Sequence, residues 1–530
     1  MHKTGIALGL LIAAGALGVI APWYTGTQLE GTLQASISQS NAQLREALPG
    51  AGASMELLSL ERGIFSSTAR YRINLGDALS DDGTPVELLF SDRIEHGPLP
   101  LSRLQAMQFQ PVMAASRFNL ELTDAVLPWF TSSGGAAPLT GTLALGYDES
   151  VTGRIRLQPL EVASAEGNMR FSGLDLDVAL GAQAASVRLN GGMDNLSFEL
   201  ARPEGAVQIR LSGLTLSTDH RLGASGFYVG GSRLALARAE VLAEDQPALL
   251  MQDFVQTDRI EERGQSLGGS VDYTVGALSY AGKPLGSVRL GMSVANLDVA
   301  ALQQLEGWYK EFLARLETAE ASAALADTDE ARLRQSLEAL LAGKPSLSLD
   351  RLSLKTANGE SSFNLRFDLA RPQSFELPPP ELARQFVSRL DARLVLAKPM
   401  IRDLITYQAS LEPQADPVAV ARQAAEAAEM AGMMATSMQV GRVEGDNIVT
   451  SLSYADGQVD FNGQVMPVEE FAGLLMAMAP PQAMGLMSGA AEAGGMGGLG
   501  EEPVEMRGLL EPEADAVLEA EQGMDASASE

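Results

Sequence analysis

Apolar and polar residues alternate with a period of two over much of this 530-residue chain, and this pattern constrains the fold most. Between residues 117 and 292 it recurs in run after run, for example in Val207, Ile209 and Leu211. Successive side chains of a strand point to opposite faces, so each run predicts a strand with one apolar and one polar face. Such strands are typical of antiparallel sheets that cover a core on one side only.

Two pairs of turn residues predict a strand meander near residues 448–461. They are Asp456-Gly457 and Asn462-Gly463, and short apolar runs flank both. Asp-Gly and Asn-Gly pairs favour type I′ turns, in which both central residues have positive φ.

One short motif occurs twice. The sequence of residues 171–176, Phe-Ser-Gly-Leu-Asp-Leu, returns at residues 211–216 as Leu-Ser-Gly-Leu-Thr-Leu. Two copies indicate a repeat without establishing one, because a solenoid requires at least three.

The hydrophobic period changes after Asp298, which predicts two helices. The first has apolar residues at steps of three and four on one face: Leu302, Leu305, Tyr309, Phe312 and Leu316. The second is predicted between the capping pair Asp327 and Glu330 and the stop signal at Gly343. This segment should interrupt the strand-rich region as a helical insertion.

A further helix is predicted to begin at Asp416-Pro417, an N-cap followed by proline at the first helical position. It carries Met430, Met434 and Met438 at steps of four. We interpret this methionine face as ordinary core packing, with a groove for a partner as the alternative.

A charge-free run from Gly5 to Tyr24 predicts a transmembrane helix, because twenty residues at about 1.5 Å each span the roughly 30 Å core of a bilayer. Lys3 precedes the run and the next basic residue is Arg45, which places the remainder outside the cytosol. A cleavable signal peptide is the alternative, but Pro22 disfavours cleavage after Ala21. The expected anchor residues are Gly5, Leu10, Leu11, Ile12, Val19, Ile20, Trp23 and Tyr24.

Composition excludes several classes of function. The chain has no cysteine, which rules out disulfides and thiolate chemistry, and its three histidines are His2, His96 and His220. The net charge of −29 argues against nucleic acid as a partner. No cofactor or metal is expected.

Carboxylate and imidazole groups lie close together in the sequence at Glu95-His96, beside Asp92, and at Asp219-His220. Neighbours on a strand point in different directions, so we interpret His96 as a turn residue that binds backbone groups. Asp219-His220 belongs to no recognisable nucleophile or metal-ligand motif. The chain also lacks the motifs of phosphate-binding loops, nucleophile elbows and zinc proteases. We therefore expect no enzymatic activity and no catalytic, cofactor-binding or metal site.

Together these patterns predict an α+β, β-dominated protein with one N-terminal transmembrane helix followed by elongated antiparallel sheets with helical insertions. The expected segments are a cytoplasmic N-terminus (1–4), a transmembrane anchor (5–24), an antiparallel β region (25–298), a helical insertion (299–345), a second β/α region that ends in the meander and a helix (346–480), and a disordered acidic tail (481–530).

Four strings of residues, at 23–26, 62–67, 96–100 and 454–459, resemble in order and spacing the YdgA-like family of bacterial envelope proteins. The resemblance covers roughly residues 1–475. It implies a single-pass inner-membrane protein with most of its chain in the periplasm, and it raises self-association as an option. It implies no catalytic residues, because the family has no established biochemical activity.

Three functions remain open. The first is an envelope protein that binds lipid or another apolar ligand in a trough formed by a one-sided sheet. The second is a scaffold that associates with itself, and the third, more distant, is a hydrolase that uses carboxylates. An open apolar trough favours the first, a filled sandwich the second, and a cleft with buried carboxylates the third.

Overall fold

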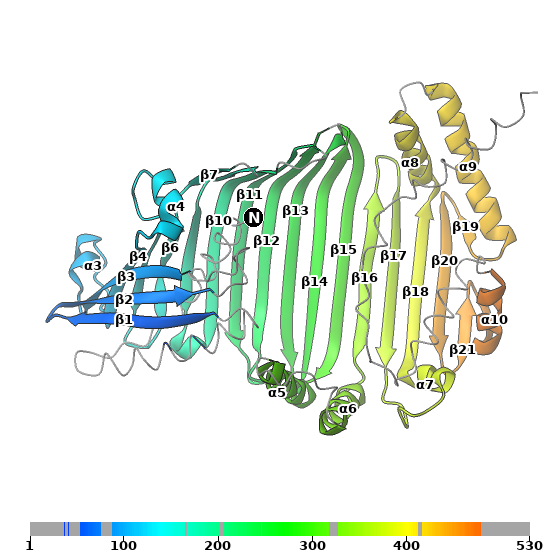
Figure 1. Ribbon diagram of the computed structural model, residues 1–530. Helices are drawn as coiled ribbons and strands as arrows, with labels where there is room; N and C mark the ends of the chain where they lie inside the picture. Colours follow the sequence, from blue (N-terminus) through cyan, green and yellow to red (C-terminus); the bar gives the residue numbers. More distant parts are fainter. Residues whose placement is uncertain are drawn as a thin grey trace, which may run out of the picture. The chain divides into compact units, whose positions relative to one another are not determined.

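A computed structural model describes residues 37, 41, 53–75, 87–164, 167–200, 205–244, 246–316, 327–411 and 416–478 (Figure 1). The chain divides into two compact units, Met1–Phe471 and Ala472–Glu530. The predicted anchor, 5–24, and the predicted acidic tail, 481–530, lie outside the described residues. Within the described ranges, no helix is both long enough and apolar enough to cross a membrane.

The first unit is built on one antiparallel sheet of 22 strands. Nine short strands begin it: β1 (Ser54–Arg62), β2 (Ser66–Asn74), β3 (Glu87–His96), β4 (Ala114–Leu120), β5 (Leu139–Leu145), β6 (Val151–Leu157), β7 (Leu160–Ser164), β8 (Gly167–Phe171) and β9 (Leu174–Leu180). Six long strands follow: β10 (Ser186–Leu200), β11 (Val207–Leu222), β12 (Tyr228–Ala243), β13 (Gln246–Arg263), β14 (Ser266–Tyr280) and β15 (Lys283–Asp298).

The sheet continues on the other side of the helical insertion. Its last strands are β16 (Ser346–Lys355), β17 (Glu360–Leu369), β18 (Val387–Ala397), β19 (Arg442–Glu444), β20 (Asn447–Ala455), β21 (Gln458–Phe461) and β22 (Gln464–Pro467). From β10 to β18 each strand pairs with the next one along the chain. The regions predicted at 25–298 and 346–480 therefore share one sheet, joined by the pairing of β15 with β16.

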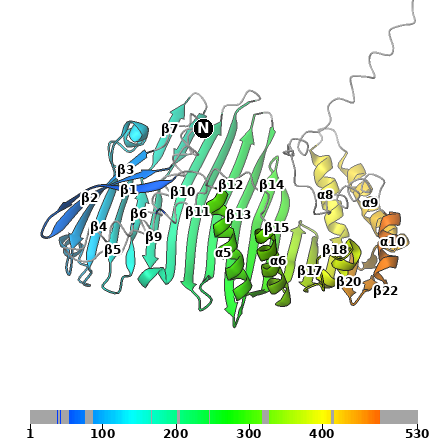
Figure 2. The same ribbon diagram turned by 60° about the horizontal axis from the view of Figure 1, so that its bottom comes forward.

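The described helices lie between strands in the sequence, except the last one, which follows β22. They are α3 (Leu101–Gln105), α4 (Leu127–Ser132), α5 (Val299–Leu316), α6 (Asp327–Ala342), α7 (Pro379–Phe386), α8 (Lys398–Ser410), α9 (Pro417–Ser437) and α10 (Val468–Met478). The two helices predicted after Asp298 are present as α5 and α6, which lie at the ends of the long strands (Figure 2). The β-dominated fold with a large antiparallel sheet and helical insertions is thus confirmed.

A filled hydrophobic core lies at the N-terminal end of the sheet. Its residues come from β1 to β9 and from the segment around α4, and Tyr71, Ile73 and Phe90 are at most 1% exposed. Leu189, Leu196 and Phe198 of β10 pack against its margin. This end of the sheet therefore closes around its own apolar face.

The twice-occurring motif marks a break in the strand alternation. Its glycines, Gly173 and Gly213, have φ of 98° and 67°, a region that favours glycine. A Cβ added at Gly213 would lie 2.7 Å from the Cβ of Ala237. Before this break the apolar residues of β11 have odd numbers, such as Leu211, and after it they have even numbers, such as Leu214. Leu211 pairs with an apolar residue of β12, and so does Leu214. The motif keeps the apolar residues of a long strand on one face.

The prediction for the methionine face is wrong. Met430, Met434 and Met438 are each more than half exposed, whereas the buried residues of α9 are Ala424, Ala428 and Gly432. The helix packs through its small residues, because these let its backbone approach its neighbours closely. The predicted N-cap is confirmed, since the Asp416 carboxylate accepts a hydrogen bond from Val418 N.

The predicted meander is also confirmed. Asp456, Gly457, Asn462 and Gly463 have φ of 50°, 78°, 55° and 87°, as type I′ turns require. The flanking residues Ala455 and Gln458 are cross-strand partners.

Replacing Gly457 by valine should lower the free energy of unfolding by about 1 kcal/mol or more, because a β-branched residue is strained at positive φ. No heavy atom lies within 4 Å of a Cβ added there, so backbone strain is the main source of the loss. Urea unfolding measures the effect, with Gly457→Asn as the control that tolerates this conformation. Equal stability of the valine and asparagine variants would contradict the turn assignment.

Candidate functional site

The apolar side chains of β11 to β18 share one face of the sheet, which we call the open face. Cross-strand partners lie on the same face, and the pairings link apolar residues into rows. One row contains Leu214, Leu236, Phe254, Val275, Val288 and Leu354. Another contains Tyr273, Leu290, Leu352, Phe363 and Leu394. The two rows overlap on β14, β15 and β16, so together they extend over all eight strands.

Side chains on the open face are only partly buried, unlike those of the N-terminal core. Leu249, Leu347 and Leu352 are 41%, 44% and 43% exposed. In the two rows above, only Leu236 is buried. Helices α5 and α6 lie at the strand ends (Figures 1 and 2), and no helix covers the centre of this face within the described part of the chain.

The open face is long enough for an extended acyl chain. Neighbouring strands lie about 4.8 Å apart, so the first row, from β11 to β16, is roughly 24 Å long. The rows run across the strands, so this length is measured along a row of apolar side chains. A ligand lying along a row contacts side chains of several strands.

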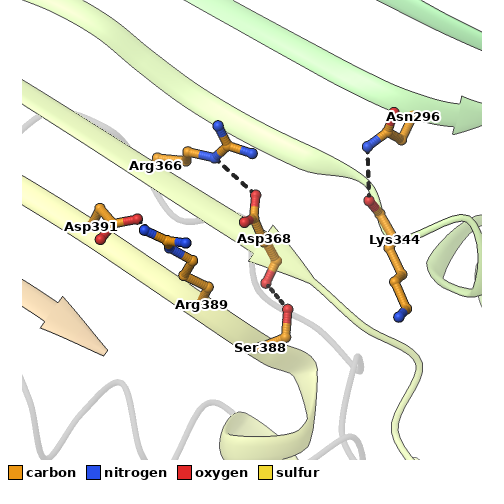
Figure 3. A network of polar contacts seen from close by, with 7 residues as sticks. All are labelled: Asn296, Lys344, Arg366, Asp368, Ser388, Arg389 and Asp391. Atoms are coloured by element: carbon orange, nitrogen blue, oxygen red, sulfur yellow. Dashed lines mark hydrogen bonds and ion pairs between the residues drawn. The ribbon is translucent and has the colours of Figure 1, made fainter. Parts of the chain in front are cut away.

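The opposite face of the sheet is polar and carries ion pairs between neighbouring strands. Arg154 pairs with Asp177 and Arg156 with Asp175, each with a shortest N–O distance of 2.7 Å. At the other end, ion pairs also form within single strands: Figure 3 shows Arg366 and Asp368 of β17, whose charged groups are 3.0 Å apart, and Arg389 and Asp391 of β18, at 2.6 Å. Exposed pairs of this kind contribute little stability each, and they keep this face solvated.

The candidate acid and base residues of β3 do not form one site. Asp92 is 6% exposed inside the core and accepts a hydrogen bond of 2.7 Å from Ser116 Oγ. His96 is hydrogen-bonded through Nε2 to Ser67 Oγ at 3.0 Å and through Nδ1 to the carbonyl of Ile64 at 3.2 Å. Glu95 accepts a hydrogen bond from Ser102 N instead. The geometry gives none of the three a shared substrate position.

The second candidate pair is also separated. Asp219 binds Arg188 across the strands at 3.2 Å, and His220, the next residue of β11, points to the other face. No group of three acidic or histidine side chains suited to a metal ion occurs within the described ranges.

Burial shifts the pKa values of two core residues. It raises the pKa of Asp92 to about 6, although hydrogen bonds from Ser116 and the Arg117 backbone act in the opposite direction. Burial, and then the nearby Asp92, raise the pKa of Tyr71 well above its usual value. The Tyr71 hydroxyl is buried and has no hydrogen-bond partner within the described structure. The core therefore contains two polar groups that burial disfavours.

Sequence reasoning missed two sets of residues. The most exposed residues of the open face, such as Leu347 and Leu352, look in sequence like any other inward strand residue. Arg93 and Arg117 were also missed, although they are direct cross-strand partners in β3 and β4. The register of the strand pairs is the signal that would find both, and a single sequence does not contain it.

The fold and the open face define a β-dominated protein built on one large antiparallel meander with an apolar side. The chain belongs to the family described as bacterial protein of unknown function (DUF945), whose model matches residues 1–469. This confirms the resemblance to the YdgA-like family.

Curated relatives match along most of their length. The chain is 26% identical to Protein YdgA of Escherichia coli (strain K12) over 489 residues, which cover 89% of this chain and 97% of that protein. It is 22% identical to the uncharacterized protein YihF of the same organism over 485 residues, or 88% and 97%. No solved structure matches.

Replacing Asp92 by asparagine should remove a pH dependence of stability. Because the pKa is higher in the folded state, the native protein binds more protons between pH 3.8 and about 6. The contribution of Asp92 is complete below this window and is lost as the pH rises through it. A shift of this size corresponds to about 3 kcal/mol, so Asp92→Asn should stabilise the protein at neutral pH relative to the parent.

Urea unfolding at acidic and neutral pH measures this effect. Asp177 provides the matched control, since its hydrogen bond with Arg154 lowers its pKa and reverses the direction. An Asp92→Asn variant that loses stability with pH as steeply as the parent would show that Asp92 ionises freely in the fold.

Proposed function

We propose that this protein is a membrane-anchored envelope protein that binds an acyl chain of a lipid on the open face, without enzymatic activity. The observation that supports this function is the exposure of large aliphatic side chains such as Leu249, Leu347 and Leu352 in one continuous apolar surface. Isolated exposed apolar residues are normal, but a contiguous surface of this kind is typical of a binding site.

The chemistry of the open face favours an acyl chain over a polar ligand. Its rows are aliphatic and aromatic, and Phe254 and Tyr273 lie side by side with ring centroids 6.4 Å apart. Each CH₂ group that leaves water contributes about 0.8 kcal/mol. A chain lying along the rows removes its own CH₂ groups and the exposed leucines from water together.

The sequence at the N-terminus supports a location beside lipid. Residues 5–24 form a charge-free run of the length of a transmembrane helix, and Lys3 precedes it. We propose a single-pass inner-membrane protein with the sheet in the periplasm. A sheet held next to a bilayer has acyl chains as its most abundant apolar ligands.

Self-association is the alternative that the open face also supports, because two copies could cover their open faces with each other. A scaffold of this kind needs no lipid. The hydrolase has less support, since the described carboxylates of β3 do not converge on a common position.

Lipid binding is tested by purifying the protein under gentle conditions and identifying bound phospholipid or fatty acid by mass spectrometry. We expect a near-stoichiometric amount in the parent protein. Leu352→Glu should greatly reduce it, because a buried charge on the open face is costly to desolvate. The side chain is 43% exposed, so the variant should still fold.

Arg289→Gln is the matched control. It removes one positive charge, as Leu352→Glu adds one negative charge. Arg289 is exposed and stands between Val288 and Leu290 of the two rows, so its side chain points to the opposite, polar face. This variant should keep its lipid. A folded parent protein that is lipid-free and dimeric or larger would favour the scaffold instead.

Topology is tested by fusing alkaline phosphatase after Tyr454, which lies in the meander. The fusion should be active, because the enzyme folds only outside the cytosol, where its disulfides form. An inactive fusion that is made in normal amounts would reverse the proposed orientation. Deletion of residues 1–25 should release the protein from the membrane.

A further inference from the structure

The polar face of β3, β4, β5, β6 and β9 carries one row of charged and hydroxyl side chains, which we call the arginine row. Cross-strand pairing places Arg93 opposite Arg117, Arg117 opposite Thr142, Thr142 opposite Arg154, and Arg154 opposite Asp177. Like charges directly opposite each other destabilise an antiparallel pair. The facing of Arg93 and Arg117 therefore needs an explanation.

The neighbouring carboxylates do not neutralise these two arginines. Asp177 is held by Arg154, which donates two hydrogen bonds of 2.7 and 3.2 Å. Glu95 accepts from Ser102 N at 2.8 Å. Within the part of the chain that the structure describes, no ion pair joins Arg93 or Arg117 to a carboxylate.

A third guanidinium reaches the same place from α3. Arg103 donates to the carbonyl of Gln110 at 3.5 Å through one terminal nitrogen. Its Nε is buried and has no hydrogen-bond partner among the described residues. A buried donor without a partner is costly and indicates a missing acceptor.

These side chains line a hollow of about 480 Å³. Its charged lining consists of four arginines, Arg93, Arg103, Arg117 and Arg154, against the carboxylates of Glu95 and Asp177. Thr142 and Thr152 add hydroxyl groups. The hollow thus has a net positive lining on a chain whose net charge is −29.

We propose that this hollow binds a phosphate group, held by Arg93, Arg103 and Arg117. A carboxylate has two oxygens, which a single guanidinium can bind in bidentate fashion. A phosphate offers more acceptor oxygens, so it can engage several guanidiniums at once and neutralise the facing pair. The hydroxyls of Thr142 and Thr152 can donate to the remaining oxygens. The site lies on the polar face, so it is independent of the acyl chain on the open face.

The test uses the full chain in detergent and inorganic phosphate as the probe. Thermal unfolding is followed as phosphate replaces chloride at constant ionic strength, and a saturable rise in Tm is expected for the parent protein. Arg117→Gln should weaken phosphate binding by about tenfold. In phosphate-free buffer the same variant should melt at or above the Tm of the parent, because the repulsion with Arg93 is gone.

This crossed result separates a binding role from a structural one, since a structural arginine would lower the Tm in both buffers. Arg289→Gln, an exposed arginine outside the hollow, should respond to phosphate as the parent does. Arg93→Gln repeats the test from the facing strand if Arg117→Gln fails to fold. No phosphate effect on the parent beyond that of chloride, or a full effect in both variants, would overturn the proposal.

A second probe identifies the source of the phosphate. Dihexanoyl phosphatidic acid, a water-soluble short-chain lipid, is titrated into the parent and the Arg117→Gln variant. Tighter binding than inorganic phosphate, lost in the variant, supports the phosphate site and assigns it to a lipid headgroup. Equal binding of the two probes, also lost in the variant, supports a site for free phosphate or a soluble phosphate ester.

Discussion

The backbone ladder between consecutive strands is the interaction on which the rest of this structure depends. From β10 to β18 each strand satisfies its backbone hydrogen bonds with the strand before and the strand after it. The sheet can therefore extend strand by strand without any second layer to complete its hydrogen bonding. The apolar side chains are then the groups still to be shielded from water, and the two ends of the sheet differ in how far this happens.

At the N-terminal end, the first nine strands bury their apolar face within the sheet itself. Phe118 is 2% exposed, and its ring fills the space where a Cβ on Gly141 would lie. Arg117 stands beside Phe118 on β4, so the proposed phosphate site lies on a strand fixed from behind by close packing. Recognition residues supported in this way keep a defined geometry. Further along the sheet, the open face has no comparable packing within the described residues.

The sequence predicts the strands, helices and turns well, but it predicts poorly which strands pair and which faces pack. Alternation identifies the strands around Ile209 and Leu290, and Asp456-Gly457 identifies a turn whose φ values agree with the prediction. These signals are local, because strand period and turn geometry depend on adjacent residues. The methionine face of α9 was misread because hydrophobicity at helical spacing does not say which face packs, and Ala424 and Ala428 do so instead.

The sites themselves depend on register, which local signals do not fix. Nothing near Arg93 in the sequence indicates that Arg117 will lie opposite it, since the two are joined through β3, α3 and β4. The exposure of Leu352 likewise depends on what covers its row, and the residue itself has the alternation of a core strand. A single sequence can predict that such a protein has an apolar face, but not whether that face is filled.

Three of the departures from ordinary packing lie where their cost is not repaid by the described neighbours. They are the uncovered leucines of the open face, the facing pair Arg93 and Arg117, and the carboxyl of Asp92 inside the core. Local inconsistency of this kind is expected at functional positions, because folding stability alone would remove it. An acyl chain would remove the first departure and a phosphate group the second. Asp92 is different, because protonation of its carboxyl removes the cost of burying a charge without any ligand. The stability of the closed end of the sheet therefore depends on pH rather than on a ligand.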